Sequence, residues 1–246
     1  MSHRIKACST TWVVGVDGCP GGWLVVRRPL DDPAAATKQV CRSFAEVLAL
    51  QADVICVDMP IGLPVVKGQG GRIADVEARY ELRGRRKASV FSVPSREAVM
   101  QLNYQDACDV ALATSCPKRK VSKQAFNIFP KIREIDALMS PILQERVYET
   151  HPEVGFWALN GEISLDESKK SILGLERRRQ LLGSAGYVPG FLTNTSQVPS
   201  RQFGKDDLLD AAVCSWTAAR IAKCGSRRFP ENPSLDARGL RMEIWA

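Results

Sequence analysis

Histidine is scarce in this chain, and its cysteines are not paired. The sequence has 2 histidines, His3 and His151, and 8 scattered cysteines with no C-x-x-C pair, which argues against a zinc site and a disulfide framework. No run of about 18 apolar residues is present, as a membrane span would need. The N-terminal segment MSHRIKACSTTW also lacks the apolar core of a signal peptide. We therefore expect a cytoplasmic protein with free thiols and no membrane partner.

The composition is that of an ordinary folded domain with an excess of positive charge. Hydrophobic residues make up 45% and charged residues 25% of the 246 positions, so we expect residues 1–246 to form a single domain. The net charge is +7. The basic clusters are Arg83 to Lys87, Lys118 to Lys123, Arg177 to Arg179, and Arg227 with Arg228. Such clusters are usually solvated helix faces, but together they suit a polyanionic partner such as nucleic acid.

An acidic residue ends a buried strand near the N-terminus. The stretch from Thr11 to Trp23, TWVVGVDGCPGGW, begins with the β-branched run of a strand buried on both faces in an α/β sheet. Asp17 follows this run, and a turn rich in glycine comes directly after it. A carboxylate at the edge of a buried strand is costly unless something binds it. Asp17 therefore either caps its own turn or holds a ligand.

The same arrangement recurs at a second strand. Residues 54–57 form another fully apolar run, which ends in Asp58, and Pro60 stops it because proline cannot continue the hydrogen-bonded ladder. If this strand lies beside the first, joined by the usual right-handed crossover, Asp17 and Asp58 converge.

A third strand, over 147–150, runs into the motif Glu149-x-His151-x-Glu153. The helix that follows is expected to have Pro152 at its first position. Because helix N-termini favour acids, Glu153 could be a capping residue as well as a ligand. His151 could contact a phosphate, although a bond to the backbone is the commoner outcome.

The remaining pattern predicts strands followed by a helical insertion. Short apolar runs predict a strand over 23–28, paired with the first in a hairpin, and another over 39–42. Residues 65–146 have interleaved polar and apolar positions and are expected to be a helical insertion packed beside the sheet. The expected helices are one from Ser43 to about Leu50, then 73–82, 95–102, 104–114, 124–139, 171–184 and 205–224.

The last expected helix carries three aspartates at its start. Asp206 and Asp207 lie in the first turn, where the helix dipole favours acids, so either could be a capping residue. Asp210 lies one turn further in, among apolar residues. Because positions i and i+3 share a helix face, Asp207 and Asp210 place two carboxylates side by side. Like charges at that spacing repel unless a cation holds them.

These acids can meet at one edge of the sheet. The carboxyl ends of neighbouring parallel strands lie at the same edge, where α/β proteins bind their ligands, and the last helix can bring its acids there. Oxygen ligands without cysteine suit a hard cation, Mg²⁺ or Mn²⁺. Two such ions about 3.5 to 4 Å apart would activate a water and stabilise the leaving oxygen in phosphodiester hydrolysis.

The ordered motifs resemble a known family. They are Gly15-Val16-Asp17-Gly18 with Gly22-Trp23, Val57-Asp58-Met59-Pro60-Ile61-Gly62-Leu63-Pro64, Val90-Phe91 with Pro94, His151-Pro152-Glu153, and Asp206-Asp207-x-x-Asp210-Ala211. From about Val13 to Ile244 this set resembles the domain-of-unknown-function 429 family, described as predicted nucleases of the ribonuclease-H-like fold. The acids also resemble, more distantly, those of the Holliday-junction resolvases of that fold.

The resemblance implies an α/β fold with a ribonuclease-H-like mixed five-stranded sheet flanked by helices, the insertion following the fourth strand. It also implies a two-metal site whose ligands are Asp17, Asp58, Asp207 and Asp210. The chain departs from the resolvases by having Asp58 in place of a glutamate, by the additional His151-Pro152-Glu153 element and by the insertion. These departures concern the substrate more than the fold.

We therefore expect a metal-dependent phosphodiester hydrolase, a nuclease, acting on nucleic acid with two Mg²⁺ or Mn²⁺ ions. The expected catalytic residues are Asp17, Asp58, Glu153, Asp207 and Asp210, and the cations or polar groups expected to bind substrate are Lys123, Arg86, Lys170 and His151, with Arg178 as a further phosphate neutraliser. DNA or RNA as substrate and the oligomeric state, a homodimer included, stay open.

Two alternatives remain at this point. One is a small-molecule phosphate-handling enzyme, because actin-like ATPases and sugar kinases also begin with a Gly-Val-Asp-Gly strand. Their glycine-rich phosphate loops are poorly matched by Gly68 to Gly71. The other is a nucleic-acid-binding protein that keeps the fold without turnover.

Overall fold

A mixed sheet lies at the centre of the molecule. The structure, a computed structural model, describes residues 10–84, 86–194 and 202–246. Five strands make the sheet, in the order β3 (Thr37–Cys41), β2 (Gly22–Pro29), β1 (Trp12–Cys19), β4 (Val54–Val57) and β5 (Val147–Glu149). β1 pairs antiparallel with β2, and β2 with β3, whereas β4 runs parallel to both β1 and β5. The mixed five-stranded sheet is therefore confirmed.

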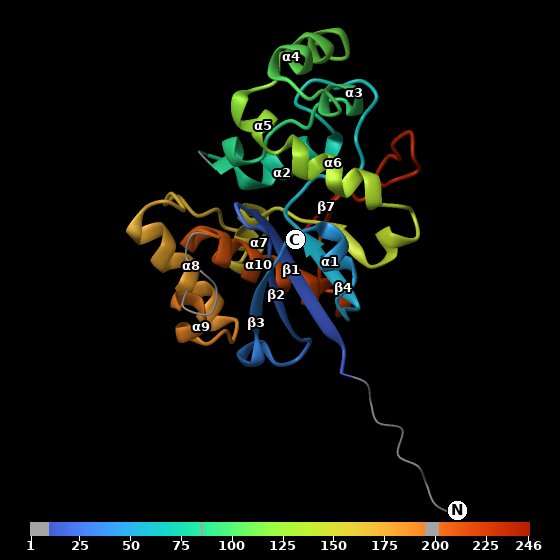
Figure 1. Cartoon of the computed structure of the whole chain (residues 1–246). Helices are drawn as coiled ribbons and strands as arrows, with labels where there is room; N and C mark the ends of the chain where they lie inside the picture. Colours follow the sequence, from blue (N-terminus) through green and yellow to red (C-terminus); the bar gives the residue numbers. More distant parts are fainter. Residues whose placement is uncertain (1–9, 85, 195–201) are drawn as a thin grey trace, which may run out of the picture.

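Helices surround the sheet (Figure 1), and several of them belong to the stretch of chain that connects β4 to β5. The elements of this inserted part are α2 (Ile73–Leu82), the 3-10 helix η2 (Arg86–Ser89), α3 (Arg96–Val99), α4 (Tyr104–Ala113), α5 (Lys123–Asn127), α6 (Phe129–Leu138) and the 3-10 helix η3 (Leu143–Glu145). The others are η1 (Pro33–Ala35), α1 (Phe44–Leu48), α7 (Pro152–Leu159), α8 (Ile172–Ser184), α9 (Pro189–Thr193), α10 (Lys205–Ala222) and the small hairpin of β6 (Arg228–Phe229) and β7 (Ile244–Trp245). The helical insertion after the fourth strand is confirmed.

The two faces of the sheet are covered by different helices. Side chains alternate along a strand, so Val14 and Val16 of β1 point into a core shared with α1 and α6, whereas Val13 packs on α10. In Figure 1 the helices α3 to α6 gather beyond the end of the sheet toward which β4 points. The insertion therefore lies over the carboxyl edge of the parallel strands.

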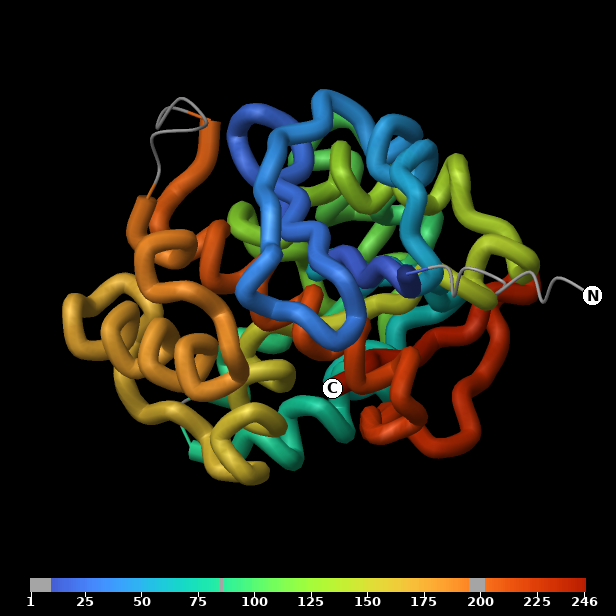
Figure 2. The backbone as a smooth tube through the Cα atoms, turned by 90° about the horizontal axis from the view of Figure 1, so that it is seen from below, coloured from blue at the N-terminus to red at the C-terminus, as the bar shows by residue number. Residues whose placement is uncertain are grey.

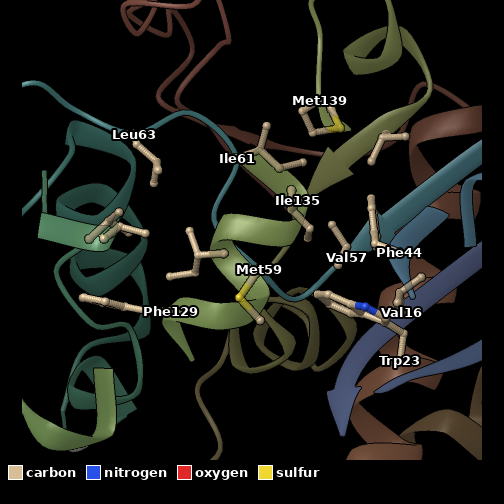
Figure 3. Close-up of a cluster of buried hydrophobic side chains, with 14 of the residues drawn as sticks. Val16, Trp23, Phe44, Val57, Met59, Ile61, Leu63, Phe129, Ile135 and Met139 are labelled. Atoms are coloured by element: carbon tan, nitrogen blue, oxygen red, sulfur yellow. The ribbon is translucent and has the colours of Figure 1, made fainter. Parts of the chain in front are cut away.

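The insertion and the sheet share one continuous hydrophobic core (Figure 3). Met59, Ile61 and Leu63 alternate along the segment after β4 and fill the space between the strands and α6. Phe129 of α6 is fully buried in this core. Burying a side chain of this size stabilises the fold by about 1.5 to 3 kcal/mol, so the core fixes the insertion firmly to the sheet edge.

The helix α10 is the principal helix of the opposite face. It packs against β1, β2 and β4 and is buried along most of its length. In Figure 2 the blue N-terminal strands cross in front of the orange-red segment that contains it. The close fit depends on Gly15, because a β-carbon there would lie 2.1 Å from the carbonyl oxygen of Ala211. Neither α10 nor any other helix within the described ranges is long and apolar enough to cross a membrane.

The prediction of one continuous helix over 124–139 was wrong. The structure has two helices there, α5 and α6, with Ile128 between them. Pro130 lies in the first turn of α6, and its ring nitrogen has no hydrogen to donate to the preceding turn. A proline is tolerated at that point only because a helix begins there, so α5 must end first.

Candidate active site

The carboxyl ends of the three parallel strands lie side by side. The backbone N–H of Asp58, directly after β4, donates to the carbonyl of Val16 at 2.9 Å, and that of Thr150, directly after β5, donates to the carbonyl of Val57 at 3.0 Å. Asp17 follows Val16 in β1. The topology therefore brings together the two strand-end aspartates, as the sequence predicts.

Both strand-end aspartates are on the side of the sheet that faces α10. Asp17 comes two residues after Gly15, which touches the backbone of α10 at Ala211. Asp58 comes two residues after Cys56, which packs in the same cluster as Cys214 of α10. Because strand side chains alternate, a separation of two residues keeps both acids on the α10 side.

The helix supplies further carboxylates from its first turns. Asp210 immediately precedes Ala211 and is only 1% exposed. Burial and then the charges of Asp58, Asp210 and Asp207 raise the pKa of Asp17. Burial also raises the pKa of Asp210 to about 7, with Lys169 acting against the shift and Asp58 adding to it. The four aspartates proposed from the sequence are thus close enough to repel one another.

The side chains of Asp17 and Asp58 accept no hydrogen bond from any residue that the structure describes. Asp17 is only 8% exposed, and Asp58 is half-buried, which is the first cause of its raised pKa. A buried carboxylate normally has a partner. The turn-capping alternative therefore fails for Asp17. Asp207 does cap its helix, since its Oδ2 accepts a hydrogen bond from the N–H of Gly204 at 2.7 Å, and its Oδ1 accepts none from the described residues.

A lysine that sequence analysis missed lies among the acids. The Lys169 ammonium donates to Asp210 Oδ2 at 2.7 Å. The charges of Asp210, Asp58 and Asp17 all raise the pKa of this ammonium, against the effect of burial. Lys169 lies in the loop between α7 and α8, where no periodicity shows which way a side chain points. The nearest signal in the sequence is its neighbour Lys170, one of the residues that the sequence predicts to bind substrate.

Glu153 lies beside the aspartates, but its carboxylate is already held. Both of its oxygens accept hydrogen bonds from Arg178 Nη2 at 2.8 Å, and Arg86 Nη1 lies 3.7 Å from its Oε1. Arg178 is 1% exposed, so it is a buried partner of Glu153 and not a solvated member of the triple arginine. The charge of Glu153 still raises the pKa of Asp58 and Asp210.

His151 caps α7 and is bonded at both ring nitrogens. Its Nδ1 accepts from the N–H of Glu153 at 3.2 Å, and its Nε2 lies 3.2 Å from the carbonyl oxygen of Ser89. Both contacts fit the neutral ring with its proton on Nε2. His151 lies near the acids, since a positive charge on its ring would lower the pKa of Asp58. Its hydrogen bonds, however, are both to the backbone, which is the second alternative that the sequence leaves open.

Glu149 faces the other side of the sheet. It accepts from Arg72 Nη1 at 2.8 Å and from the N–H of Ile61 at 2.6 Å, and Arg72 Nη2 also binds Asp75 at 2.8 Å. These three charged side chains are almost fully buried. Burial raises the pKa of Glu149 to about 7, although Arg72 acts against the shift. Glu149 therefore anchors the segment after β4; it lines a small crevice together with Asp58, but its carboxylate is held by Arg72 and the N–H of Ile61.

The two lysines that the sequence predicts to bind substrate, Lys123 and Lys170, form no hydrogen bond or ion pair with the acids of the site among the residues that the structure describes. Lys123 Nζ lies 4.1 Å from the centre of the Tyr104 ring, within the insertion. Lys170 is exposed, and its N–H donates to Ser168 Oγ at 3.3 Å. The structure thus groups the aspartates with Lys169, Glu153 and His151, and leaves Lys123 apart.

Across residues 10–84, 86–194 and 202–246, no three His, Cys, Asp or Glu side chains are arranged to hold a metal ion. The donor atoms nevertheless have the right chemistry, since the repelling groups are all carboxylates and hard cations prefer oxygen. A cation, the Lys169 ammonium, is bound to Asp210. The cluster thus has the chemistry of a cation site without the ready geometry of a cage.

The raised aspartate pKa values predict how stability depends on pH. Because Asp17, Asp58 and Asp210 have folded pKa values above their ordinary 3.8, the folded protein keeps protons that the unfolded chain has lost. Stability without metal should therefore fall as the pH rises through the folded pKa, about 7 for Asp210, at about 1.4 kcal/mol per unit of pKa shift. We expect the Tm in EDTA to fall from pH 4 to 8, and Asp17→Asn to reduce that fall.

The matched control is Asp109→Asn, an exposed aspartate of α4. This variant should follow the wild-type curve, and Glu149 contributes equally to all three proteins. Parallel curves for wild type and Asp17→Asn would contradict the electrostatic picture of the site.

Comparison with known proteins places the chain in a family. The model of the family described as "Protein of unknown function (DUF429)" matches residues 15–235, a range that holds all four aspartates. The comparison with curated proteins and the comparison with solved structures returned no match. The strand order and the mixed pairing are consistent with the ribonuclease-H-like fold that the motifs imply. Because the family model matches most of the length of this chain, the chain belongs to the DUF429 family.

Proposed function

We propose that this protein is a metal-dependent phosphodiester hydrolase that acts on nucleic acid, with Asp17, Asp58, Asp207 and Asp210 holding two Mg²⁺ or Mn²⁺ ions. One observation carries the proposal: Asp17 and Asp58 are crowded against Asp210 and accept no hydrogen bond from the described residues. Such an arrangement costs stability unless it binds something positive. Carboxylates whose pKa values are raised by burial and by neighbouring like charges are common at active sites.

Metal ions would supply an activated water and stabilise the charge on the leaving oxygen. The residues of the chain have separate parts in this proposal. Asp17 and Asp58 are fixed by the sheet, and α10 presents Asp210 against them. Arg178 holds the carboxylate of Glu153, so Glu153 is not free to bind a metal ion. Its charge instead repels those of Asp58 and Asp210. Lys169 neutralises Asp210 and, once released from it, can reach a substrate phosphate.

The direct test is cleavage of labelled RNA, duplex DNA and branched DNA with Mg²⁺ or Mn²⁺. Asp58→Asn should cut at least about 100-fold more slowly than wild type, because loss of groups that merely support metal ligands already costs about 10- to 100-fold. Asp109→Asn, distant on α4, should cut like wild type. Wild-type protein that leaves every substrate intact would sink the proposal. Thermal stabilisation by ATP would then favour the small-molecule alternative.

Removal of Lys169 should strengthen metal binding. Its ammonium competes with a metal ion for Asp210, and two unit charges about 4 Å apart repel by about 4 kcal/mol at an effective dielectric of 20. We expect Lys169→Met to bind Mn²⁺ at least about tenfold more tightly than wild type by calorimetry, since part of that repulsion is lost.

Lys170→Met is the matched control for this measurement. Lys170 is the next residue and is exposed, so its loss should leave the Mn²⁺ affinity unchanged. Equal or weaker binding by Lys169→Met would mean that the ammonium does not stand where the ions bind.

A further inference from the structure

A groove between α2 and η2 has only basic charges on its described walls. It has a volume of about 890 Å³, and its lining includes Arg79, Arg83 and Lys87 but no aspartate or glutamate among the residues that the structure describes. Arg79 is tied to the carbonyl of Val90 at 2.9 Å, so it shapes the wall. Arg83 and Lys87 are exposed. The groove is therefore open to a polyanion.

An aromatic ring stands exposed in the same groove. Tyr80 of α2 is 73% exposed, and its neighbour in the lining, Val76, is 42% exposed. Tyr80 and Val76 together form an exposed apolar surface on the wall of a groove, and contiguous exposed apolar surface often marks a binding site. Because every nucleobase has a flat π face, an exposed ring beside cations is the usual platform for single-stranded nucleic acid.

The groove lies next to the aspartate site. Val90 and Phe91 line the groove and also a small crevice that includes Asp58 and His151. The contacts of η2 join the same two places, since the carbonyl of Ser89 lies 3.2 Å from His151 Nε2. The groove and the crevice are therefore neighbours that share the wall formed by Val90 and Phe91.

A second basic cavity also borders Phe91. It has a volume of about 170 Å³ and is lined by Phe91, Lys67, Arg119 and Lys120, again with no acid among the described lining residues. Burial and the charges of Arg119 and Arg79 lower the pKa of Lys67. Asp75 acts against this shift, but no acid lines either cavity among the described residues, so cations border Phe91 in both, as a run of phosphates would require.

We propose that the α2 groove binds single-stranded nucleic acid, with a base stacked on Tyr80 and phosphates on Arg83 and Lys87, and guides the strand past Phe91 to the aspartates. The single strand is favoured because bases in a duplex are stacked on each other and cannot reach Tyr80. This inference rests on the proposed function only for where the strand leads. Binding itself requires no hydrolysis.

The test measures fluorescence anisotropy of short labelled oligothymidylate and oligouridylate, and of a duplex of equal length, with the full-length chain in EDTA so that nothing is cut. Tyr80→Leu should bind the single strands at least about fivefold more weakly than wild type, whereas Tyr80→Phe, which keeps the ring, should bind like wild type. The double variant Arg83→Gln with Lys87→Gln should reduce the slope of log affinity against log salt by about 1.4, at about 0.7 per phosphate contact.

Lys223→Gln is the matched charge control, since Lys223 follows the C-terminal end of α10 and pairs with Asp31. It should leave the affinity for single strands almost unchanged. Tighter binding of the duplex, or equal weakening by Tyr80→Phe and Tyr80→Leu, would overturn the proposal. Binding as expected by a protein that cuts nothing with Mn²⁺ would support the groove and refute the hydrolase. Cleavage by wild type, combined with wild-type affinity in Tyr80→Leu and in the double variant, would support the hydrolase and refute the groove.

Discussion

Replacing Gly15 by alanine is expected to lower the free energy of unfolding by more than about 3 kcal/mol, the upper end of the usual cost of overpacking. The added β-carbon would lie 2.0 Å from the backbone nitrogen of Ser215 and 2.1 Å from the carbonyl oxygen of Ala211. Neither is a flexible side chain that can turn away, so β1 and α10 must separate. The same separation moves Asp17 from Asp210, and Mn²⁺ binding should be lost with the stability.

Chemical denaturation and calorimetry measure these two effects. The matched control is Gly183→Ala in α8, where a β-carbon meets no atom within 4 Å. Alanine in a helix is better than glycine by up to about 1 kcal/mol, so this variant should be slightly stabilised. A Gly15→Ala protein with wild-type stability would show that α10 does not lie as closely on β1 as described.

Arg72→Met is expected to cost about 3 to 5 kcal/mol, because removal of one member of a buried ion pair leaves the other charge buried and unpaired. Here two carboxylates, Glu149 and Asp75, would lose their cation. Arg72 also donates to the carbonyls of Ile61 and Gly62, so the segment after β4 would loosen. The loss should shrink at low pH, where Glu149, with its pKa about 7, takes up a proton.

Lys223→Met serves as the control for Arg72→Met. The ion pair of Lys223 with Asp31 is largely in water, with side chains 54% and 81% exposed, and exposed pairs contribute at most about 1 kcal/mol. Urea denaturation of both variants at pH 5 and 8 tests the difference. Similar small losses would argue that the buried network contributes little to stability.

The strand-end acids and Asp210 of α10 could be predicted because each of these aspartates interrupts a strong hydrophobic pattern. Asp17 and Asp58 end apolar strands of β-branched residues, and Asp210 lies among the apolar residues of a helix. Such breaks are visible in one sequence, since hydrophobic periodicity is a local property. The resemblance of the ordered motifs predicted that the sheet is mixed, and β1 does pair antiparallel with β2 and parallel with β4.

The partners of the acids could not be predicted in the same way. Lys169 and Arg178 look like ordinary surface cations in the sequence, and only the approach of distant elements makes one the partner of Asp210 and the other that of Glu153. Arg72 follows a glycine pair and has no pattern that marks it as buried. Pro130, in contrast, is a local signal in the sequence that a helix begins beside it.

The position of α10 late in the chain has a consequence for synthesis. The ribosome delivers Gly15 and Asp17 nearly 200 residues before Ala211 and Asp210, the residues against which they pack. Contacts so distant in sequence form slowly and late. A nascent chain can pair β1 with β2 and β4 as they emerge, but it cannot assemble the cluster of acids until α10 has left the exit tunnel. Under the proposed function, the unfinished polypeptide would therefore lack an assembled site with which to cut the messenger from which it is being translated.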